Sequence, residues 1–567
     1  MLRHLTILLL AGLLLSLPLL IFGFPPVGDL IFHYQWQASF TDQLLSGDLY
    51  PRWLLWSNRG YGSPDFLFYG PVAFYVGAVS RVFFGSDIYA LKQLGASCAF
   101  ALCLSGISAF MWLRSYGTNT AACIGAILYM VFPYHLYVDL YVRGAYAEFW
   151  ALAWLPLILY SVRRVATQGK HGVLLAASFA MLVFTHLPTT LIFSPIAIAY
   201  GLLCCRWSNA NWRRVMMLAL SFVVGIALSA VYWFPAVALK KFTVSMTNGR
   251  LNYSNNFVPS LDGAGFSEQL QIVSVVALAM LAVLVISIVV LMGRQCSAKV
   301  VSRVDRDIWF WCCVTLYSIF MMSSVSLSIW KNLPILQNVQ FPWRFLVVAT
   351  IALPPILTKS MVHLDLRPLH ILAGALVSLC LALASGMPYS KPTYWDARAR
   401  IAKLTSSVET KQETLEEPWN TAGVYVFLPI WAAAFRDNLV LQPHRQIVES
   451  SAIISVVTWK AGNIRLHFSG KAPSLLTIGQ FYFPGWRAFL PDGKAVSLGP
   501  NPESGLMMLD LPGGDGTLNI SFDETPEMMY SRLISLFAFG GTLTLLVLAT
   551  VARVQLNRHT PNIKPHL

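Results

Sequence analysis

The segment that follows the first apolar stretch contains the residues best suited to chemistry. Asp29 and His33 are four residues apart, so a helix that begins here would place both side chains on one face. Asp29 follows an apolar span directly, where a lipid-borne substrate would present its head group, and ionisable groups at a membrane boundary are functional candidates. In the structural alternative, Asp29 is a helix N-cap, Val27 packs against the start of the helix as a hydrophobic staple, and His33 has no role. We favour function for Asp29 and retain His33 as a substrate-binding candidate.

Two arginines lie further along the same loop, each beside aromatic residues. Arg52 stands in Tyr50-Pro51-Arg52-Trp53 and Arg59 in Asn58-Arg59-Gly60-Tyr61. A guanidinium group can bind phosphate with two hydrogen bonds, and aromatic faces suit sugar rings. Aromatic belts also mark any membrane interface, so Arg52 and Arg59 are substrate-binding candidates with a structural alternative.

A second charged loop, bracketed by apolar spans, carries Asp139, Arg143 and Glu148. Asp139 and Arg143 have the i, i+4 spacing of an ion pair, which could serve the fold alone or a site. Glu148 opens a span, where an acidic residue is favourable to the helix dipole by itself. We predict that Asp139 and Glu148 accompany Asp29 in catalysis and that Arg143 binds substrate.

Two further candidates stand at the ends of apolar segments. His186 lies in Thr185-His186-Leu187-Pro188, where two short spans break, and interrupted membrane helices are tolerated where they line a cavity or are covered by protein. Arg344, in Phe341-Pro342-Trp343-Arg344, is either an interfacial arginine or a clamp for a lipid phosphate. Both are predicted to bind substrate, although a buried structural histidine is the simpler interpretation of His186.

The composition indicates that the elements that position these residues are membrane-spanning helices. Of the 567 residues, 56% are hydrophobic and only 12% are charged, which is typical of a polytopic α-helical membrane protein. The net charge of +14 resides in short clusters between apolar runs, as in cytoplasmic loops, so nucleic-acid binding is disfavoured. The nine cysteines lie in apolar spans or a basic loop, so neither a disulfide framework nor a zinc site is indicated.

The charge pattern predicts about twelve spans, with both termini in the cytoplasm. This count requires Phe66 to Phe84 to lie along the outer interface, because a crossing there would move every basic cluster outside. It also includes a span at 369–386.

The predicted organisation has three parts. Residues 1–387 form the transmembrane domain, whose first outer loop is 25–91, and 531–567 form the last span and a cytoplasmic tail. Residues 388–530 form an extracytoplasmic domain, mixed and helical at its start. Its second half alternates polar and apolar residues between turn signals, which predicts a β-sandwich with IRLHFSG, SLLTIGQFYF, GLMMLDL and TLNISF as its clearest strands.

Several motifs together resemble a known family. An acidic residue after the first span, a second charged outer loop and a C-terminal outer domain resemble the GT-C superfamily of membrane glycosyltransferases. More closely, the chain resembles bacterial YfhO-like proteins and the membrane family labelled 6-pyruvoyl-tetrahydropterin synthase-related, through GDLIFH, YPRW, NRGYGSPDFLFYGP, RGAYAE, THLP, QFPWRF and FYFPGWRAFLPDGK. The pterin label does not suit the sequence, because such a synthase is a small soluble zinc enzyme and no compact three-histidine pattern occurs here.

The resemblance implies an inverting glycosyltransferase that moves a sugar from a polyprenyl-phosphate carrier to an envelope glycan, lipid or protein acceptor. The site would lie on the extracytoplasmic face of the bacterial inner membrane. By carry-over, Asp29 matches the catalytic aspartate of the first loop, and Glu148 or Asp139 the acidic residue of the second. The DxD form that holds a metal in some members is missing, so no cofactor is certain and a divalent metal stays an open alternative.

Two other classes compete with this interpretation. A transporter or flippase for a lipid-linked substrate would carry charges deep in several spans and inverted repeats, which the sequence does not show. A noncatalytic assembly protein would use the sandwich to bind glycans.

Overall fold

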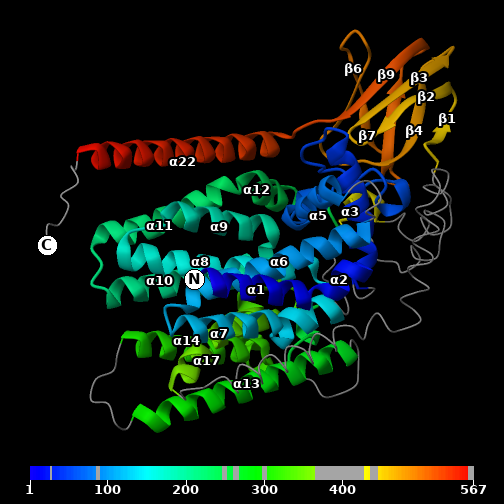
Figure 1. Cartoon of the computed structure of the whole chain (residues 1–567). Helices are drawn as coiled ribbons and strands as arrows, with labels where there is room; N and C mark the ends of the chain where they lie inside the picture. The colour runs from blue at the N-terminus through cyan, green and yellow to red at the C-terminus, as the bar shows by residue number, and fades with distance from the viewer. Residues whose placement is uncertain are drawn as a thin grey trace.

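The computed structural model describes residues 1–25, 29–84, 90–244, 252–259, 267–295, 303–363, 427–433 and 445–559. Figure 1 shows a layered helical bundle with a β-domain at one end. The N-terminal half supplies α1 (Leu2–Leu15), α2 (Leu17–Phe22), α3 (Leu30–Leu45), α4 (Asp65–Phe68), α5 (Val72–Phe84), α6 (Ala90–Leu113), α7 (Asn119–Val131), α8 (Tyr146–Gln168), α9 (Gly172–Thr185) and α10 (Leu187–Trp207). It is followed by α11 (Trp212–Leu228), α12 (Ala230–Leu239), α13 (Ser267–Gln295), α14 (Arg303–Met322), α15 (Leu327–Asn332), α16 (Pro334–Gln337), α17 (Leu346–His363) and α22 (Pro526–His559).

Seven of the described helices are long and apolar enough to cross a membrane, or up to nine if each of two bent pairs is one span. The helical membrane architecture is therefore as predicted, but the count of about twelve is not confirmed. One reason is that α1, α5 and α9 are apolar yet shorter than a bilayer requires. The predicted span at 369–386, like the mixed start of the outer domain, lies outside the described residues.

The ambiguous segment Phe66 to Phe84 divides into the short α4 and the 13-residue α5. The break falls at Gly70-Pro71, where the backbone approaches the end of α9 closely. A Cβ on Gly70 would lie 2.1 Å from the carbonyl oxygen of Thr185, so a larger residue cannot fit there. The first loop therefore packs against the end of α9. The break predicted at His186-Leu187-Pro188 is present, because α9 ends at Thr185 and α10 begins at Leu187.

The C-terminal β-domain is a sandwich of two antiparallel sheets. One has the order β1-β4-β8-β7 and the other β2-β3-β9-β5-β6. The strands are β1 (Ile447–Ser450), β2 (Ile453–Lys460), β3 (Asn463–Gly470), β4 (Ser474–Phe481), β5 (Trp486–Phe489), β6 (Ala495–Val496), β7 (Leu498–Pro500), β8 (Leu506–Leu511) and β9 (Gly514–Phe522). The four segments predicted as strands coincide with β3, β4, β8 and β9. Burial alternates along β3, as expected for a strand with one face on the core, whereas the second half of β4 is buried throughout.

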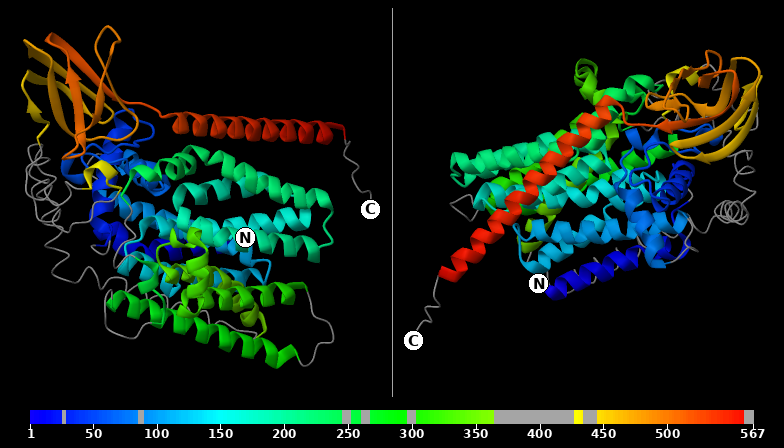
Figure 2. Two further views of the ribbon diagram at one scale, coloured as in Figure 1. Left: turned by 180° about the vertical axis from the view of Figure 1, so that it is seen from behind. Right: turned by 90° about the horizontal axis from the view of Figure 1, so that it is seen from above.

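The first loop completes the core of this sandwich. Trp53 and Tyr61 are buried in the same apolar cluster as the inward-facing strand residues. The indole N–H of Trp53 donates to Oε1 of Gln480 in β4 over 3.0 Å, and the N–H of Phe481 donates to the carbonyl of Tyr61 over 2.6 Å. Figure 2 shows the sandwich beside the first loop, with α22 leading away along one side of the bundle. The first loop and the sandwich therefore form one body at one end of the bundle.

Candidate active site

Asp29 lies at the start of α3 with its carboxylate available. It occupies the N-cap position, but its side chain makes no capping hydrogen bond. Its backbone N–H instead donates to the carbonyl oxygen of Arg143, over 3.3 Å. Burial raises the pKa of the Asp29 carboxyl, and the nearby guanidinium groups of Arg143 and Arg344 oppose this shift. By surface area Asp29 is nevertheless exposed, so its carboxylate, although surrounded by protein, can be reached from outside.

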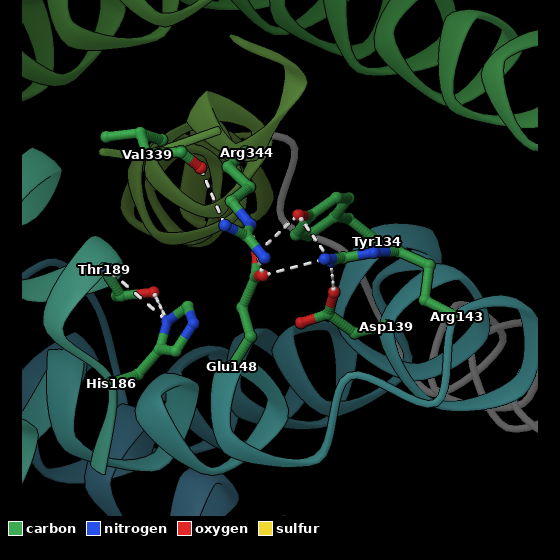
Figure 3. A network of polar contacts seen from close by, with 8 residues as sticks. All are labelled: Tyr134, Asp139, Arg143, Glu148, His186, Thr189, Val339 and Arg344. Carbon is green, nitrogen blue, oxygen red and sulfur yellow. Dashed lines mark hydrogen bonds and ion pairs between the residues drawn. The ribbon is translucent and has the colours of Figure 1, made fainter. Parts of the chain in front are cut away.

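The second loop presents Arg143 from a π-helical segment, Pro133–Val142, which continues α7. Such wide turns are rare and are frequently found at functional sites. Nη1 of Arg143 contacts Asp139 Oδ1 and donates to the hydroxyl of Tyr134 over 3.2 Å, while Nη2 donates to Oε2 of Glu148 over 3.0 Å. The predicted i, i+4 pair of Asp139 and Arg143 is present, and it belongs to a larger network (Figure 3).

Glu148 stands in the first turn of α8 and holds two arginines at once. Its Oε1 accepts from the Tyr134 hydroxyl over 2.6 Å. Its Oε2 accepts from Arg143 and also from Nε of Arg344, over 3.1 Å. Glu148 is 1% exposed, so both of its oxygens are committed inside the protein. Its geometry suits the positioning of guanidinium groups better than proton transfer to a substrate.

The same two arginines also make cation–π contacts with aromatic rings. The guanidinium carbon of Arg143 lies 4.4 Å from the ring centroid of Trp343, and that of Arg344 lies 5.0 Å from the centroid of Phe341. The two rings stack on each other, with centroids 4.9 Å apart and planes 11° apart. Nη1 of Arg344 also donates to the carbonyl of Val339 over 2.7 Å. Among the described residues, Nη2 of Arg344 has no hydrogen-bond acceptor, so this nitrogen can bind an anion.

His186 lies at the break between α9 and α10, beside the same cluster (Figure 3). Its Nδ1 lies 2.7 Å from the hydroxyl of Thr189 and accepts weakly from the backbone N–H of that residue. Burial lowers the pKa of His186 to about 3, although the neighbouring Glu148 carboxylate opposes the shift. The ring is therefore neutral at physiological pH, and it can offer a neutral hydrogen bond but no charge.

Three of the predicted binding residues have other surroundings. Arg52 pairs with Glu524, over 3.4 Å, just before α22. His33 is 1% exposed among aromatic rings, including those of Trp36 and Tyr146, and burial lowers its pKa to about 3. The side chain of Arg59 lies outside the described residues. The structure thus brings together Asp29, Asp139, Arg143, Glu148, His186 and Arg344.

One family model matches this region. It is described as a 6-pyruvoyl-tetrahydropterin synthase related domain of membrane proteins, and it matches residues 66–389, more than half of the chain. The chain belongs to this family. No functionally curated protein matches it.

Several solved structures of membrane glycosyltransferases are similar to this synthase-related membrane protein. Mycobacterial arabinofuranosyltransferase AftD has a TM-score of 0.44 at 14% identity, over 68% of this chain and 27% of AftD. The oligosaccharyltransferase of Archaeoglobus fulgidus has a TM-score of 0.39 at 15% identity, over 72% of this chain and 56% of the other. ArnT of Cupriavidus metallidurans, solved with undecaprenyl phosphate, has a TM-score of 0.31 at 12% identity, over 62% and 76%. The chain therefore spans about a quarter to about a half of the first two proteins.

A pterin-synthase type of zinc site has no counterpart in the part of this family member that the structure describes. There, no three His, Cys, Asp or Glu side chains lie close enough together to hold a metal ion.

Sequence reasoning missed three members of the site. Tyr134 was part of the charged loop, but nothing in its spacing marks it as a partner of Glu148. Phe341 and Trp343 shortly precede Arg344 in the sequence, so contact of these rings with Arg344 was foreseeable. The position of the Arg143 guanidinium group over the ring of Trp343 was not.

Proposed function

We propose that this synthase-related membrane protein is an inverting glycosyltransferase that uses a polyprenyl-phosphate sugar and acts outside the cytoplasm of a bacterial cell. The observation that carries the proposal is the accessible carboxylate of Asp29, which makes no capping hydrogen bond, close to Arg143 and Arg344. This arrangement supplies a base and an anion-binding pair at one point.

The reaction needs a base and a cation for the leaving phosphate, and this cluster offers both. Asp29 removes the proton of the acceptor hydroxyl while the oxygen of that hydroxyl forms a bond to the anomeric carbon. The bond between that carbon and the phosphate oxygen breaks, and the electron pair leaves with the phosphate. Arg344 and Arg143 stabilise the departing charge, and a phosphate needs no strong general acid. One displacement of this kind inverts the anomeric centre.

The remaining residues of the cluster have supporting roles. Glu148 holds both arginines in place through Oε2. Asp139 contacts Nη1 of Arg143, whereas Glu148 contacts Nη2, so the two carboxyl groups hold the guanidinium group together. His186 contributes a neutral hydrogen bond to the substrate. A metal ion is not needed for this scheme, because the guanidinium groups carry the charge compensation.

The decisive experiment is an in vitro assay of the full chain in nanodiscs with a panel of undecaprenyl-phosphate monosaccharides. Turnover that is lost in Asp29→Asn supports the proposal. Movement of the lipid-linked sugar between leaflets without turnover would instead indicate a flippase. Binding without either would indicate an assembly protein.

A further inference from the structure

Two helix pairs bend sharply at the end of the bundle that holds the candidate site, and their bent ends meet. The pair α11 and α12 is bent by 66°, and the pair α14 and α15 by 78°. Nζ of Lys240, which follows α12, donates to Oδ1 of Asn338, which follows α15 and α16, over 2.7 Å. This hydrogen bond joins the two bent ends at the surface of the protein.

The meeting point is connected to the candidate site through the next residue of the chain. Asn338 precedes Val339, whose carbonyl oxygen accepts from Nη1 of Arg344 over 2.7 Å. Val339 is fully buried, whereas Lys240 and Asn338 are exposed. The turn that contacts Lys240 at the surface therefore also holds the guanidinium group of Arg344 in the interior.

Three exposed lysines lie on the two bent ends, and we call them the lysine rim. Lys240 and Lys241 follow α12, and Lys331 lies in the last turn of α15. The carbonyl oxygen of Trp330, next to Lys331, accepts from Nε2 of Gln337 over 3.2 Å, which fastens α15 to the turn before Asn338. None of the three lysines forms an ion pair with a residue that the structure describes. Their positive charges are therefore not compensated within the described part of the chain.

Exposed apolar side chains accompany the lysine rim. Val237 in α12 is 65% exposed, Leu333 is 49% exposed, and Ile335 in α16 is 58% exposed. Apolar side chains of this kind are favourable against lipid, and neighbouring lysines extend their ammonium groups to the level of the head groups. Uncompensated ammonium groups beside lipid-facing side chains suit the phosphate of a lipid head group.

Continuity with Arg344 indicates which lipid binds there. Lys240 uses one of its three N–H donors on Asn338, so two remain for an anion. Arg344, the proposed partner of the carrier phosphate, lies on the inner side of the same turn. A lipid phosphate that approaches Arg344 across this turn meets the lysine rim first.

We propose that the lysine rim binds the phosphate of the polyprenyl carrier at the membrane surface, on its way to Arg344. The identification of this lipid as the carrier of the sugar donor rests on the proposed function. The lysine rim thus determines how tightly the donor is captured, whereas Arg344 and Arg143 act on the phosphate during transfer.

Binding is tested first without any reaction. Native mass spectrometry of the full chain in detergent measures the binding of undecaprenyl phosphate and, separately, of phosphatidylglycerol. Lys240→Gln combined with Lys241→Gln should weaken binding of undecaprenyl phosphate about 25-fold, because one lysine beside an anionic head group contributes about five-fold. Lys331→Gln alone should weaken it about five-fold. The matched control is Lys471→Gln, an exposed lysine of the turn after β3, which should bind as the unmodified chain does.

Equal binding of undecaprenyl phosphate in the double variant and in Lys471→Gln would overturn the site. Equal losses of undecaprenyl phosphate and phosphatidylglycerol in the double variant would indicate a general contact with anionic lipids and overturn the assignment to the carrier. In an active preparation, the double variant should raise KM for the lipid-linked donor and not for the acceptor, and an unchanged KM for the donor contradicts the proposal. If no glycosyl transfer is found but binding of undecaprenyl phosphate depends on the lysine rim, the proposed function fails and the lipid site stands.

Discussion

The backbone N–H of Asp29 donates to the carbonyl oxygen of Arg143, over 3.3 Å. This contact joins the first loop to the second and fixes where the Asp29 carboxylate lies relative to the arginines. It also bears on the placement of Phe66 to Phe84. A full crossing by that segment would have separated Asp29 from Glu148, whereas the two loops meet at the same end of the bundle.

Asp29→Asn should abolish glycosyl transfer while leaving the protein folded. Loss of a general base typically costs about 10²–10⁴-fold in rate. Since burial raises the pKa of Asp29, kcat/KM in the unmodified protein should rise with pH through that raised pKa as the carboxyl loses its proton. The measurement is kcat/KM against pH with a lipid-linked sugar. Asp48→Asn, an exposed carboxylate of the same loop, is the control. Full activity in Asp29→Asn would remove Asp29 from the mechanism.

Arg344→Ala should lower kcat by about 10²–10³-fold, comparable to the loss of one donor that stabilises a developing anion. Arg344→Lys should restore only part of the rate, because an ammonium group lacks the planar fork of a guanidinium. The exposed pair of Arg81 with Asp42 provides the control, since Arg81→Ala should change neither rate nor stability much. Equal rates in Arg344→Ala and Arg81→Ala would argue against a phosphate at this position.

Glu148→Gln should destabilise the protein as well as inactivate it. The substitution leaves the buried guanidinium groups of Arg143 and Arg344 without their shared carboxylate, and breaking such a buried pair costs about 3–5 kcal/mol. Thermal unfolding of the detergent-solubilised chain should show a lower Tm than that of Asp29→Asn. A Glu148→Gln protein that keeps its Tm but loses activity would indicate that Glu148 acts in the chemistry itself.

Asp65→Asn should change how stability depends on pH. Burial raises the pKa of Asp65 to about 7, against hydrogen bonds donated by Ser57 and Ser63. The folded state therefore holds a proton that the unfolded state releases between about pH 4 and pH 7, so this group makes the free energy of unfolding fall as pH rises through that window. The variant, which cannot ionise, should show a flatter Tm profile from pH 4 to 8. Identical slopes in the two proteins would show that Asp65 does not titrate in this range.

The sequence by itself determined the local features. Continuous apolar runs predicted the long helices, alternation predicted β3, β4, β8 and β9, and His186-Leu187-Pro188 marked a helix break that is present. The pair of Asp139 and Arg143 could also be predicted, because a helical turn brings residues four apart together. Each of these follows from forces that act over one or two turns of the chain.

Only the tertiary structure decided which charges meet. Arg344 is 196 residues from Glu148 and pairs with it, whereas Arg52, which was also a candidate for binding phosphate, lies 472 residues from Glu524 and pairs there instead. The sequence also left open whether the Asp29 carboxylate caps α3 or is free for a substrate. In the structure Asp29 occupies the N-cap position, but its side chain makes no capping hydrogen bond. Local patterns cannot settle such choices, because a buried charge takes its partner from whichever helix or loop the packing of the whole bundle brings beside it.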